Sequence, residues 1–199
     1  MKISDITKKN KIGNKYNLDV DGVFYVEIDK SLIVDLGLYK SMEVDKSFLD
    51  RIILTENYQK CLAKAFIFLS IRMFSEEELK RKLLNKFTEP IVLEVISRLK
   101  ELKYVNDFVF ASNWINSRLK DHGQYLLKQE LRQKGVEDDL IESLLKSILE
   151  EDEIKRAKIF IEKKHLDGLA KEQKNKKAQD LLNRRGFSFS VINKALNEE

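Results

Sequence analysis

The sequence predicts a mainly α-helical protein of tandem three-helix repeat units, forming an elongated curved array, with a small N-terminal β-hairpin segment. Beyond residue 56, apolar residues recur at intervals of three and four, which is typical of amphipathic helices. Before residue 56, they alternate with polar residues, as in half-buried strands. The helical pattern itself recurs after 48 positions, which is typical of stacked helical units. This shift places one opening triplet on the next: Ala63, Phe66 and Ile67 on Ala111, Trp114 and Ile115.

A third, looser copy of the pattern follows the second. Ala157, Phe160 and Ile161 repeat the opening triplet, and the residues that resemble the middle of the second copy are Leu182, Arg185 and Gly186. We therefore expect four segments. They are an N-terminal β-hairpin with short helices (1–56), repeat 1 (57–105), repeat 2 (106–152) and a divergent repeat 3 (153–199).

Two apolar rows in the N-terminal segment predict a hairpin around Asp21 and Gly22. A three-residue loop with a bulge would pair Val20 with Phe24 and Leu18 with Val26, which keeps both rows on one face. Because a lone hairpin is marginal in water, we also expect a strand near residues 2–7 or support from helices. Short helices are predicted at 31–38 and 47–56, the second beginning at Ser47.

Helix boundaries within the repeats follow from capping residues. Ser75 and Glu78 form a predicted capping box at the start of the middle helix of repeat 1, and Pro90 fits the first turn of the next helix. In repeat 2, Gly123 replaces the capping box and Gly135 ends the middle helix in a left-handed conformation. Repeat 3 has about five extra residues around 165–171, and the basic run that follows, 171–177, is either a mobile arm or a solvated face.

Composition predicts a soluble, cytoplasmic protein. Hydrophobic residues make up 43% and charged residues 35% of the 199 positions, as is normal for a helix-rich domain. The apolar run 65–71 is too short to span a membrane, and the first ten residues lack the apolar core of a signal peptide. The single cysteine, Cys61, has no partner for an internal disulfide and is expected to be a buried core residue.

The net charge of +4 is unevenly distributed along the chain. The four predicted segments carry −1, +4, −4 and +5 in order, counted from their Lys, Arg, Asp and Glu residues. Alternating blocks suit a protein that lies along a polyanion or a charged protein surface, although plain solubility explains them as well.

Residues that would carry catalysis or bind a metal are few. The only histidines, His122 and His165, lie in different repeats without a partner at metal-ligand spacing. The acidic run 137–139 is explained by a helix start, and the sequence has no phosphate-binding loop or nucleophile elbow. We expect no enzyme activity, no metal and no cofactor. The aromatic residues Phe66, Trp114 and Phe160 are predicted to be core residues rather than stacking platforms for bases.

Three motifs resemble the RecX family, the bacterial regulators of the recombinase RecA. The first-unit motif consists of Arg72, Ser75, Glu78, Leu79 and Leu83. The inter-unit motif consists of Tyr104, Val105, Asn106, Asp107, Phe108 and Ala111. The second-unit motif consists of Gln129, Glu130, Leu131, Arg132, Gln133, Lys134, Gly135 and Val136. Two departures stand out: Phe87 replaces the glycine that usually follows the lysine, and the extra residues near Lys171 are unusual.

The resemblance implies a protein that binds in the groove of a RecA filament on single-stranded DNA. Family members inhibit the strand exchange, ATP hydrolysis and co-protease activities of RecA without an active site of their own. The expected partners are the RecA filament and, through it, single-stranded DNA, with no membrane, and the protein is expected to be a monomer. Its predicted contact residues are Arg72, Lys80, Lys86, Lys128, Arg132, Lys134, Lys176, Lys177, Arg184 and Arg185.

Two other functions remain open from the residues alone. Three-helix units can present a recognition helix to duplex DNA, which predicts binding that weakens steeply with salt and needs no RecA. A general helical scaffold that binds a partner peptide would instead have a groove lined with anchor residues.

Overall fold

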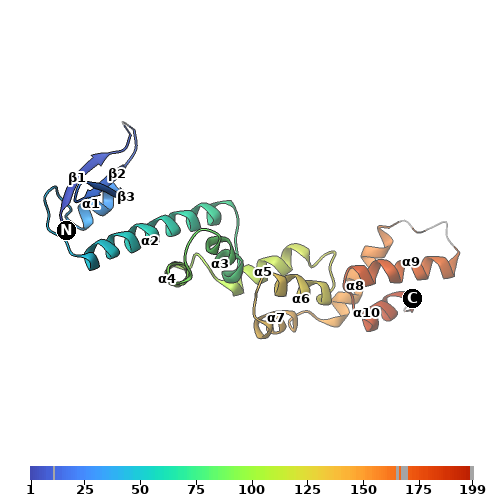
Figure 1. The fold of residues 1–199 in the computed structure, drawn as a ribbon. Coiled ribbons are helices and arrows are strands. Elements are labelled where there is room, and N and C mark those ends of the chain that lie inside the picture. The colour runs from blue at the N-terminus through green and yellow to red at the C-terminus, as the bar shows by residue number, and fades with distance from the viewer. Residues whose placement is uncertain (11, 165, 167–169, 198–199) are drawn as a thin grey trace. The chain divides into compact units, whose positions relative to one another are not determined.

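The structure is a computed structural model, and it describes residues 1–10, 12–164, 166 and 170–197. The chain divides into two compact units (Figure 1). The first unit comprises Met1–Ile71 and Lys82–Arg98, and the second comprises Arg72–Arg81 and Leu99–Glu199. None of the described helices is both long and apolar enough to cross a membrane.

The first unit begins with a three-stranded antiparallel sheet in the order β1–β2–β3. Its strands are β1 (Ile3–Lys8), β2 (Lys15–Val20) and β3 (Val23–Asp29). The strand expected before the hairpin is therefore present. One face of the sheet packs on α1 (Lys30–Asp35), and its core is formed by apolar side chains that include Leu18, Ile28 and Leu32.

The hairpin loop is shorter than predicted. Val20 pairs with Val23 rather than with Phe24, so only Asp21 and Gly22 form the turn, with φ angles of 49° and 82°. Positive φ at both positions is typical of the turn whose twist matches that of two paired strands. The predicted pairing of Leu18 with Val26 is present because a bulge lies inside the strand, between the pairings of Leu18 and Asp19. The bulge was expected, but it lies farther from the turn.

A single helix, α2 (Lys46–Ile71), replaces the two helices that the sequence predicts on either side of residue 57. The predicted segment boundary at 56/57 therefore falls inside this helix. Its first turn is capped by Asp45 rather than by Ser47, since the Asp45 carboxylate accepts a hydrogen bond from the Phe48 N–H at 2.7 Å.

Glu56 holds the sheet against α2. Its side chain is only 1% exposed. It accepts a hydrogen bond from the Asp29 N–H at 3.1 Å and contacts the ammonium groups of Lys15 at 3.2 Å and Lys60 at 3.3 Å. The buried carboxylate thus has both a hydrogen-bond donor and opposite charges, as its burial requires. Because it lies where β2 begins and β3 meets α1, it fixes the sheet on the middle of the long helix.

The remaining helices of repeat 1 are α3 (Glu76–Leu84) and α4 (Glu89–Glu101). Pro90 lies in the first turn of α4, as predicted. The buried positions include Cys61 and Ala65 on α2, and Val92 and Ile96 on α4. Phe66, however, is 36% exposed, so the prediction that it is a core residue is wrong.

Repeat 2 is formed by α5 (Asp107–Arg118), α6 (Gln124–Gln133) and α7 (Asp138–Leu145), each of which contacts the other two (Figure 1). Gly123 is the N-cap of α6, and Gly135 has a φ of 78°, as predicted. Trp114 packs half-buried against the core of the repeat, which is formed by Phe110, Ala111, Ile115, Leu127, Leu131, Val136, Ile141 and Leu145.

Repeat 3 is formed by α8 (Glu150–Glu162), α9 (Lys171–Arg184) and α10 (Phe189–Asn197). Phe160 is buried in its core together with Leu182 and Ile192. The basic run 171–177 is the first half of α9 and is mainly exposed. It is therefore a solvated helix face and not a mobile arm. His165 and most of the extra residues before α9 lie outside the described part of the chain.

Candidate functional site

The motif residues at the start of α3 form an ion triad. The Glu78 carboxylate accepts two hydrogen bonds from the Arg72 guanidinium, both at 2.9 Å, and one from Lys134 Nζ at 2.9 Å. The hydrogen bonds from Arg72 lower the pKa of Glu78 to about 2, with a further contribution from Lys134. The side chain of Glu78 is 15% exposed, whereas that of Arg72 is 43% exposed, so the carboxylate is shielded from water while one of its partners is not.

Ser75 links this triad to repeat 2. Its hydroxyl accepts a hydrogen bond from the Glu78 N–H at 3.2 Å and donates one to the carbonyl oxygen of Lys134. Only half of the predicted capping box is present, because the Glu78 carboxylate is bound by the two cations instead of reaching back to the backbone. The N-terminus of α3 therefore docks on the last turn of α6.

Two further contacts complete this joint between repeats. Asp107, at the start of α5, accepts a hydrogen bond from the Glu76 N–H at 2.8 Å, and Arg81 donates one to the carbonyl oxygen of Gln133 at 3.0 Å. Burial raises the pKa of Asp107, although the hydrogen bond to its carboxylate opposes this. The joint thus satisfies backbone groups at both helix ends with side chains from the neighbouring repeat.

A second joint repeats this arrangement between repeats 2 and 3. The N–H of Gly123 donates to the carbonyl oxygen of Arg185 at 2.8 Å, and the N–H of Gln124 donates to the buried carboxylate of Glu153 at 2.9 Å. Glu153 follows Asp107 by 46 positions, the same separation as Ala157 from Ala111. The N-terminus of each middle helix therefore docks on the C-terminal turn of the next middle helix.

Glycine is required where these helix ends meet. A Cβ atom at Gly135 would lie 2.4 Å from Glu77 Cβ, and one at Gly186 would lie 2.4 Å from Leu126 Cβ. Both glycines also have positive φ angles, 78° and 75°. The corresponding position of repeat 1 is Phe87, which is not among the described residues with a positive φ angle.

Each of the last two repeats also presents an aromatic ring flanked by two cations. In repeat 2, the guanidinium of Arg118 lies 3.5 Å and Lys134 Nζ 5.0 Å from the centre of the Trp114 ring. In repeat 3, Lys164 and Arg185 contact the ring of Phe160 in the same way. These pairs are cation–π interactions. The rings therefore position positive charge near the two joints.

The predicted contact residues do not form one cluster. In the second unit, Arg72 and Lys134 are bound in the ion triad, and Arg185 lies over Phe160 at the second joint. Arg184, Lys176 and Lys177 are exposed on α9, and Lys80 is half-buried on α3. Lys86 is exposed in the first unit.

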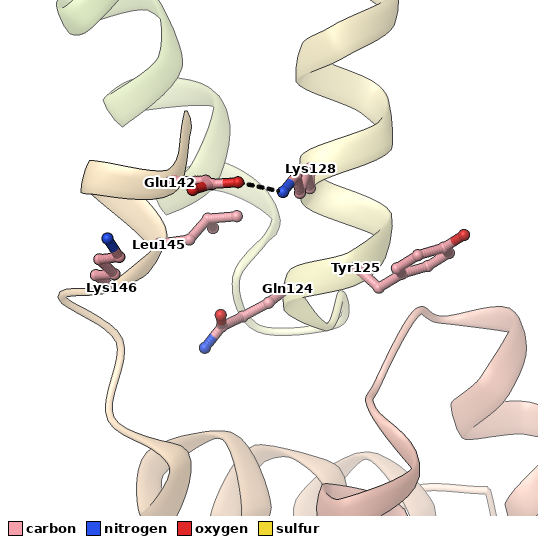
Figure 2. Close-up of a pocket in the computed structure, with 6 residues that line it drawn as sticks. All are labelled: Gln124, Tyr125, Lys128, Glu142, Leu145 and Lys146. Carbon is pink, nitrogen blue, oxygen red and sulfur yellow. Dashed lines mark hydrogen bonds and ion pairs between the residues drawn. The ribbon is translucent and has the colours of Figure 1, made fainter. Parts of the chain in front are cut away.

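Lys128 and Arg132 on α6 are paired with carboxylates of α7. Lys128 Nζ lies 2.7 Å from Glu142, and Figure 2 shows the two side chains reaching toward each other while Tyr125 points away from them. Arg132 makes a two-pronged contact with Asp138, which holds the pKa of that carboxyl below its usual value. The acidic start of α7 therefore binds a neighbouring cation through Asp138, while the N-cap residue Glu137 makes no side-chain hydrogen bond to the helix. The part of the chain that the structure describes contains no group of histidine, cysteine and carboxylate side chains that could hold a metal ion.

Sequence reasoning misses the acceptors that form the joints. The motif around Ser75 predicts a capping role for Glu78, and no pattern predicts a contact across repeats for Asp107 or Glu153. The only available signal is the common position of these two residues near the start of the first helix of a repeat. Spacing alone does not show that this position faces the previous repeat.

Comparisons with known proteins agree with the repeat architecture. A family model for the first three-helix domain of RecX matches residues 61–99, and one for the second three-helix domain matches residues 106–145. A crystal structure of regulatory protein RecX superimposes with a TM-score of 0.75 at 24% identity, covering 100% of this chain and 99% of that one. A crystal structure of RecX from Lactobacillus salivarius gives a TM-score of 0.67 at 23% identity, covering 72% of this chain and 97% of that one.

Curated relatives cover nearly the whole sequence. Regulatory protein RecX of Bacillus subtilis (strain 168) is 33% identical over 201 residues, which is 98% of this chain and 76% of the relative. Regulatory protein RecX of Clostridioides difficile (strain 630) is 31% identical and covers 98% of this chain and 94% of the relative. Because two RecX domain models match the chain, and because curated RecX proteins are more than 30% identical over 98% of it, the chain belongs to the RecX family of regulatory proteins.

Proposed function

We propose that this protein is a negative regulator of the RecA recombinase. It binds in the groove of the RecA filament on single-stranded DNA and inhibits ATP hydrolysis, strand exchange and co-protease activity. The observation that carries the proposal is the match to regulatory proteins RecX over 98% of the chain. The protein acts by occupying a surface and needs no catalytic group of its own.

The two joints support this function physically. A protein that binds a regular filament must hold its contact groups at fixed separations, because any freedom between them is lost on binding at an entropic cost. In the second unit, side-chain and backbone hydrogen bonds fix the start of α3 on α6 and the start of α6 on α9. The distances between the cations on α6 and those on α9 are therefore fixed.

The exposed cations of repeat 3 are the best candidates for direct contact. Lys176, Lys177 and Arg184 are exposed on α9, whereas Arg72 and Lys134 are bound within the first joint. Exposed cations can meet an anionic protein surface or a phosphate without breaking an existing ion pair. Reversing the charge of Lys134 would instead place a carboxylate beside Glu78 and disrupt the fold.

The test is the ATPase rate of RecA on single-stranded DNA as the protein is titrated in. The wild type is expected to lower the rate at less than one protein per RecA. The triple variant Lys176→Glu, Lys177→Glu, Arg184→Glu is expected to need at least about tenfold more protein, because three attractive contacts become repulsive.

A matched control reverses the charge of Lys30, Lys46 and Lys120, which are exposed residues outside the predicted contact set. Each triple variant changes the net charge by the same amount, so equal loss of inhibition in both would show only a general charge effect and reject the contact face. If the wild type does not inhibit at excess, the regulator function itself is rejected. Salt-sensitive binding to duplex DNA without RecA would then favour the DNA-binding alternative.

A further inference from the structure

Arg118, in the last turn of α5, is a cation that the predicted contact residues do not include. Its guanidinium lies 3.5 Å from the centre of the Trp114 ring, and its Nε lies 3.3 Å from the Glu130 carboxylate. The ring is itself held in place, because Trp114 Nε1 donates a hydrogen bond to Glu130 at 2.8 Å and the ring stacks on Phe110. The guanidinium of Arg118 is therefore positioned before any partner binds.

This guanidinium has one donor that is not used within the described chain. Nη1 of Arg118 donates to the Ser117 hydroxyl at 3.2 Å, whereas Nη2 has no hydrogen-bond partner among the residues that the structure describes. The side chain is 34% exposed, so an acceptor on another molecule can reach it. A guanidinium that stacks on a ring and is held by an ion pair loses little rotamer freedom on binding. Such arginines are frequent among the residues that dominate binding energy at interfaces.

The surface around Arg118 is continuous with the ion triad of the first joint. Lys134 Nζ lies 5.0 Å from the centre of the Trp114 ring and 2.9 Å from the Glu78 carboxylate. Arg72, the other cation bound to Glu78, has a side chain that is 43% exposed. All of these residues belong to the second unit. Three cations therefore lie along one connected set of contacts.

The composition and charge of this surface favour a protein partner over DNA. Met73 is 47% exposed, and its sulfur lies 3.5 Å from the side-chain nitrogen of Asn113, the residue before Trp114. Arginine, methionine and tryptophan are enriched at protein–protein interfaces. The three cations are offset by the carboxylates of Glu78 and Glu130. Because affinity for DNA depends on how many phosphates are neutralised, so small an excess of positive charge suits a single directed contact better than a polyanion.

We propose that Arg118 is a contact residue for the RecA filament, and that it binds a carboxylate of the protein rather than a phosphate of the DNA. The carboxylate accepts a hydrogen bond from Arg118 Nη2, with Lys134 as a second cation nearby. An apolar side chain next to that carboxylate lies against Met73. Trp114 is a positioning residue, because its ring holds the guanidinium in place. This contact rests on the regulator function proposed above and names one group of the partner that the protein binds.

The test compares variants in the ATPase assay of RecA on single-stranded DNA at one salt concentration. Arg118→Met keeps an apolar stem against Trp114 but has no donor, so we expect half-inhibition to need about tenfold more protein. Arg118→Lys keeps the charge but loses the planar fork, and should need about threefold more. Arg51→Met is the matched control, since Arg51 lies over the ring of Phe48 in the first unit. It should inhibit like the wild type.

The positioning role of Trp114 has its own pair of variants. Trp114→Leu removes the ring and should need about threefold more protein for half-inhibition, because Arg118 is no longer held. Trp114→Phe restores a ring and should recover most of the inhibition. Urea unfolding followed by circular dichroism shows which variants are folded, and only these are compared. If Trp114→Leu unfolds, the two Arg118 variants still test the contact.

A labelled single-stranded oligonucleotide without RecA tests the alternative acceptor. We expect the wild type and Arg118→Met to bind it equally, as measured by fluorescence anisotropy. A tenfold loss of this binding would show that Arg118 contacts phosphate and would overturn the proposal. Inhibition by the folded Arg118 variants at the wild-type level, or an equal loss in Arg51→Met, overturns it while leaving the regulator function intact. A wild type that does not inhibit at excess rejects the regulator function and this contact with it.

Discussion

Replacing Gly135 by alanine should open the joint between repeats 1 and 2. The left-handed backbone at φ 78° costs an alanine about 1 kcal/mol. The new Cβ would also lie 2.4 Å from Glu77 Cβ and 2.5 Å from its Cγ, and the rigid start of α3 must move to relieve this overlap. Three hydrogen bonds of the joint would be lost: Ser75 to Lys134, Arg81 to Gln133 and Lys134 to Glu78.

The expected loss is about 4 kcal/mol of unfolding free energy, at about 1 kcal/mol for each lost bond plus the backbone strain. Urea unfolding followed by the fluorescence of Trp114, the only tryptophan, measures it in the unit that contains the joint. Gly37→Ala is the matched control, since Gly37 has a φ of 60° and a Cβ added there would meet no atom within 4 Å. Followed by circular dichroism, it should lose only about 1 kcal/mol.

A double-mutant cycle separates the overlap from the strain. Glu77→Gly removes both close atoms and leaves the Cα at 3.8 Å, at a cost of about 1 kcal/mol in helix propensity. We expect the double variant to be more stable than the sum of the single losses predicts by about 3 kcal/mol, because the three hydrogen bonds that the overlap breaks are kept. Additivity within about 0.5 kcal/mol, or a Gly135→Ala loss no larger than that of Gly37→Ala, would refute the role given to this glycine.

Two further predictions concern titratable groups. Glu78 has a pKa of about 2 in the folded chain against an ordinary value of 4.5. Its ion pairs therefore stabilise the fold above pH 5, and this stabilisation is lost as the pH falls toward 2. The variant Glu78→Gln should lack about 2 kcal/mol of this pH-dependent stability. Parallel stability curves for wild type and variant between pH 7 and 2.5 in urea would contradict this. Burial raises the pKa of Cys61 to about 11, so its thiol should react with Ellman's reagent at pH 8 only as fast as the protein unfolds. The same sample in urea serves as the control, and rapid labelling of the native protein would show that the thiol is accessible.

Local backbone features were predictable because they depend on few residues. The cap at Gly123 and the left-handed Gly135 follow from glycine conformation, and strand parity shows that the hairpin needs a bulge, although not where the bulge lies. The two-residue turn at Asp21 and Gly22 was not predicted. A bulge at any position between Leu18 and the turn keeps both apolar rows on one face of the sheet, so the alternation of side chains does not show where the bulge lies.

Contacts between segments that lie far apart in the sequence could not be predicted from its periodicity. The hydrogen bond between Asp107 and the Glu76 N–H joins residues 31 positions apart, and no spacing rule indicates it. Phe66 and Phe160 occupy equivalent positions in repeats 1 and 3, but Phe66 is exposed and Phe160 is buried. The difference depends on the side chains that surround each residue, which the two repeats do not share. The predicted contact residues for RecA stay a prediction, because the positions of cations do not identify what they bind.

The two joints give the repeat array a direction. In each joint the start of one middle helix meets the glycine that follows the next middle helix, Glu77 at Gly135 and Leu126 at Gly186. Repeat 2 therefore takes part in one joint through each end of α6. Because such a head-to-tail contact does not close on itself, a further copy of repeat 2 could be inserted between repeats 2 and 3 without a new kind of contact.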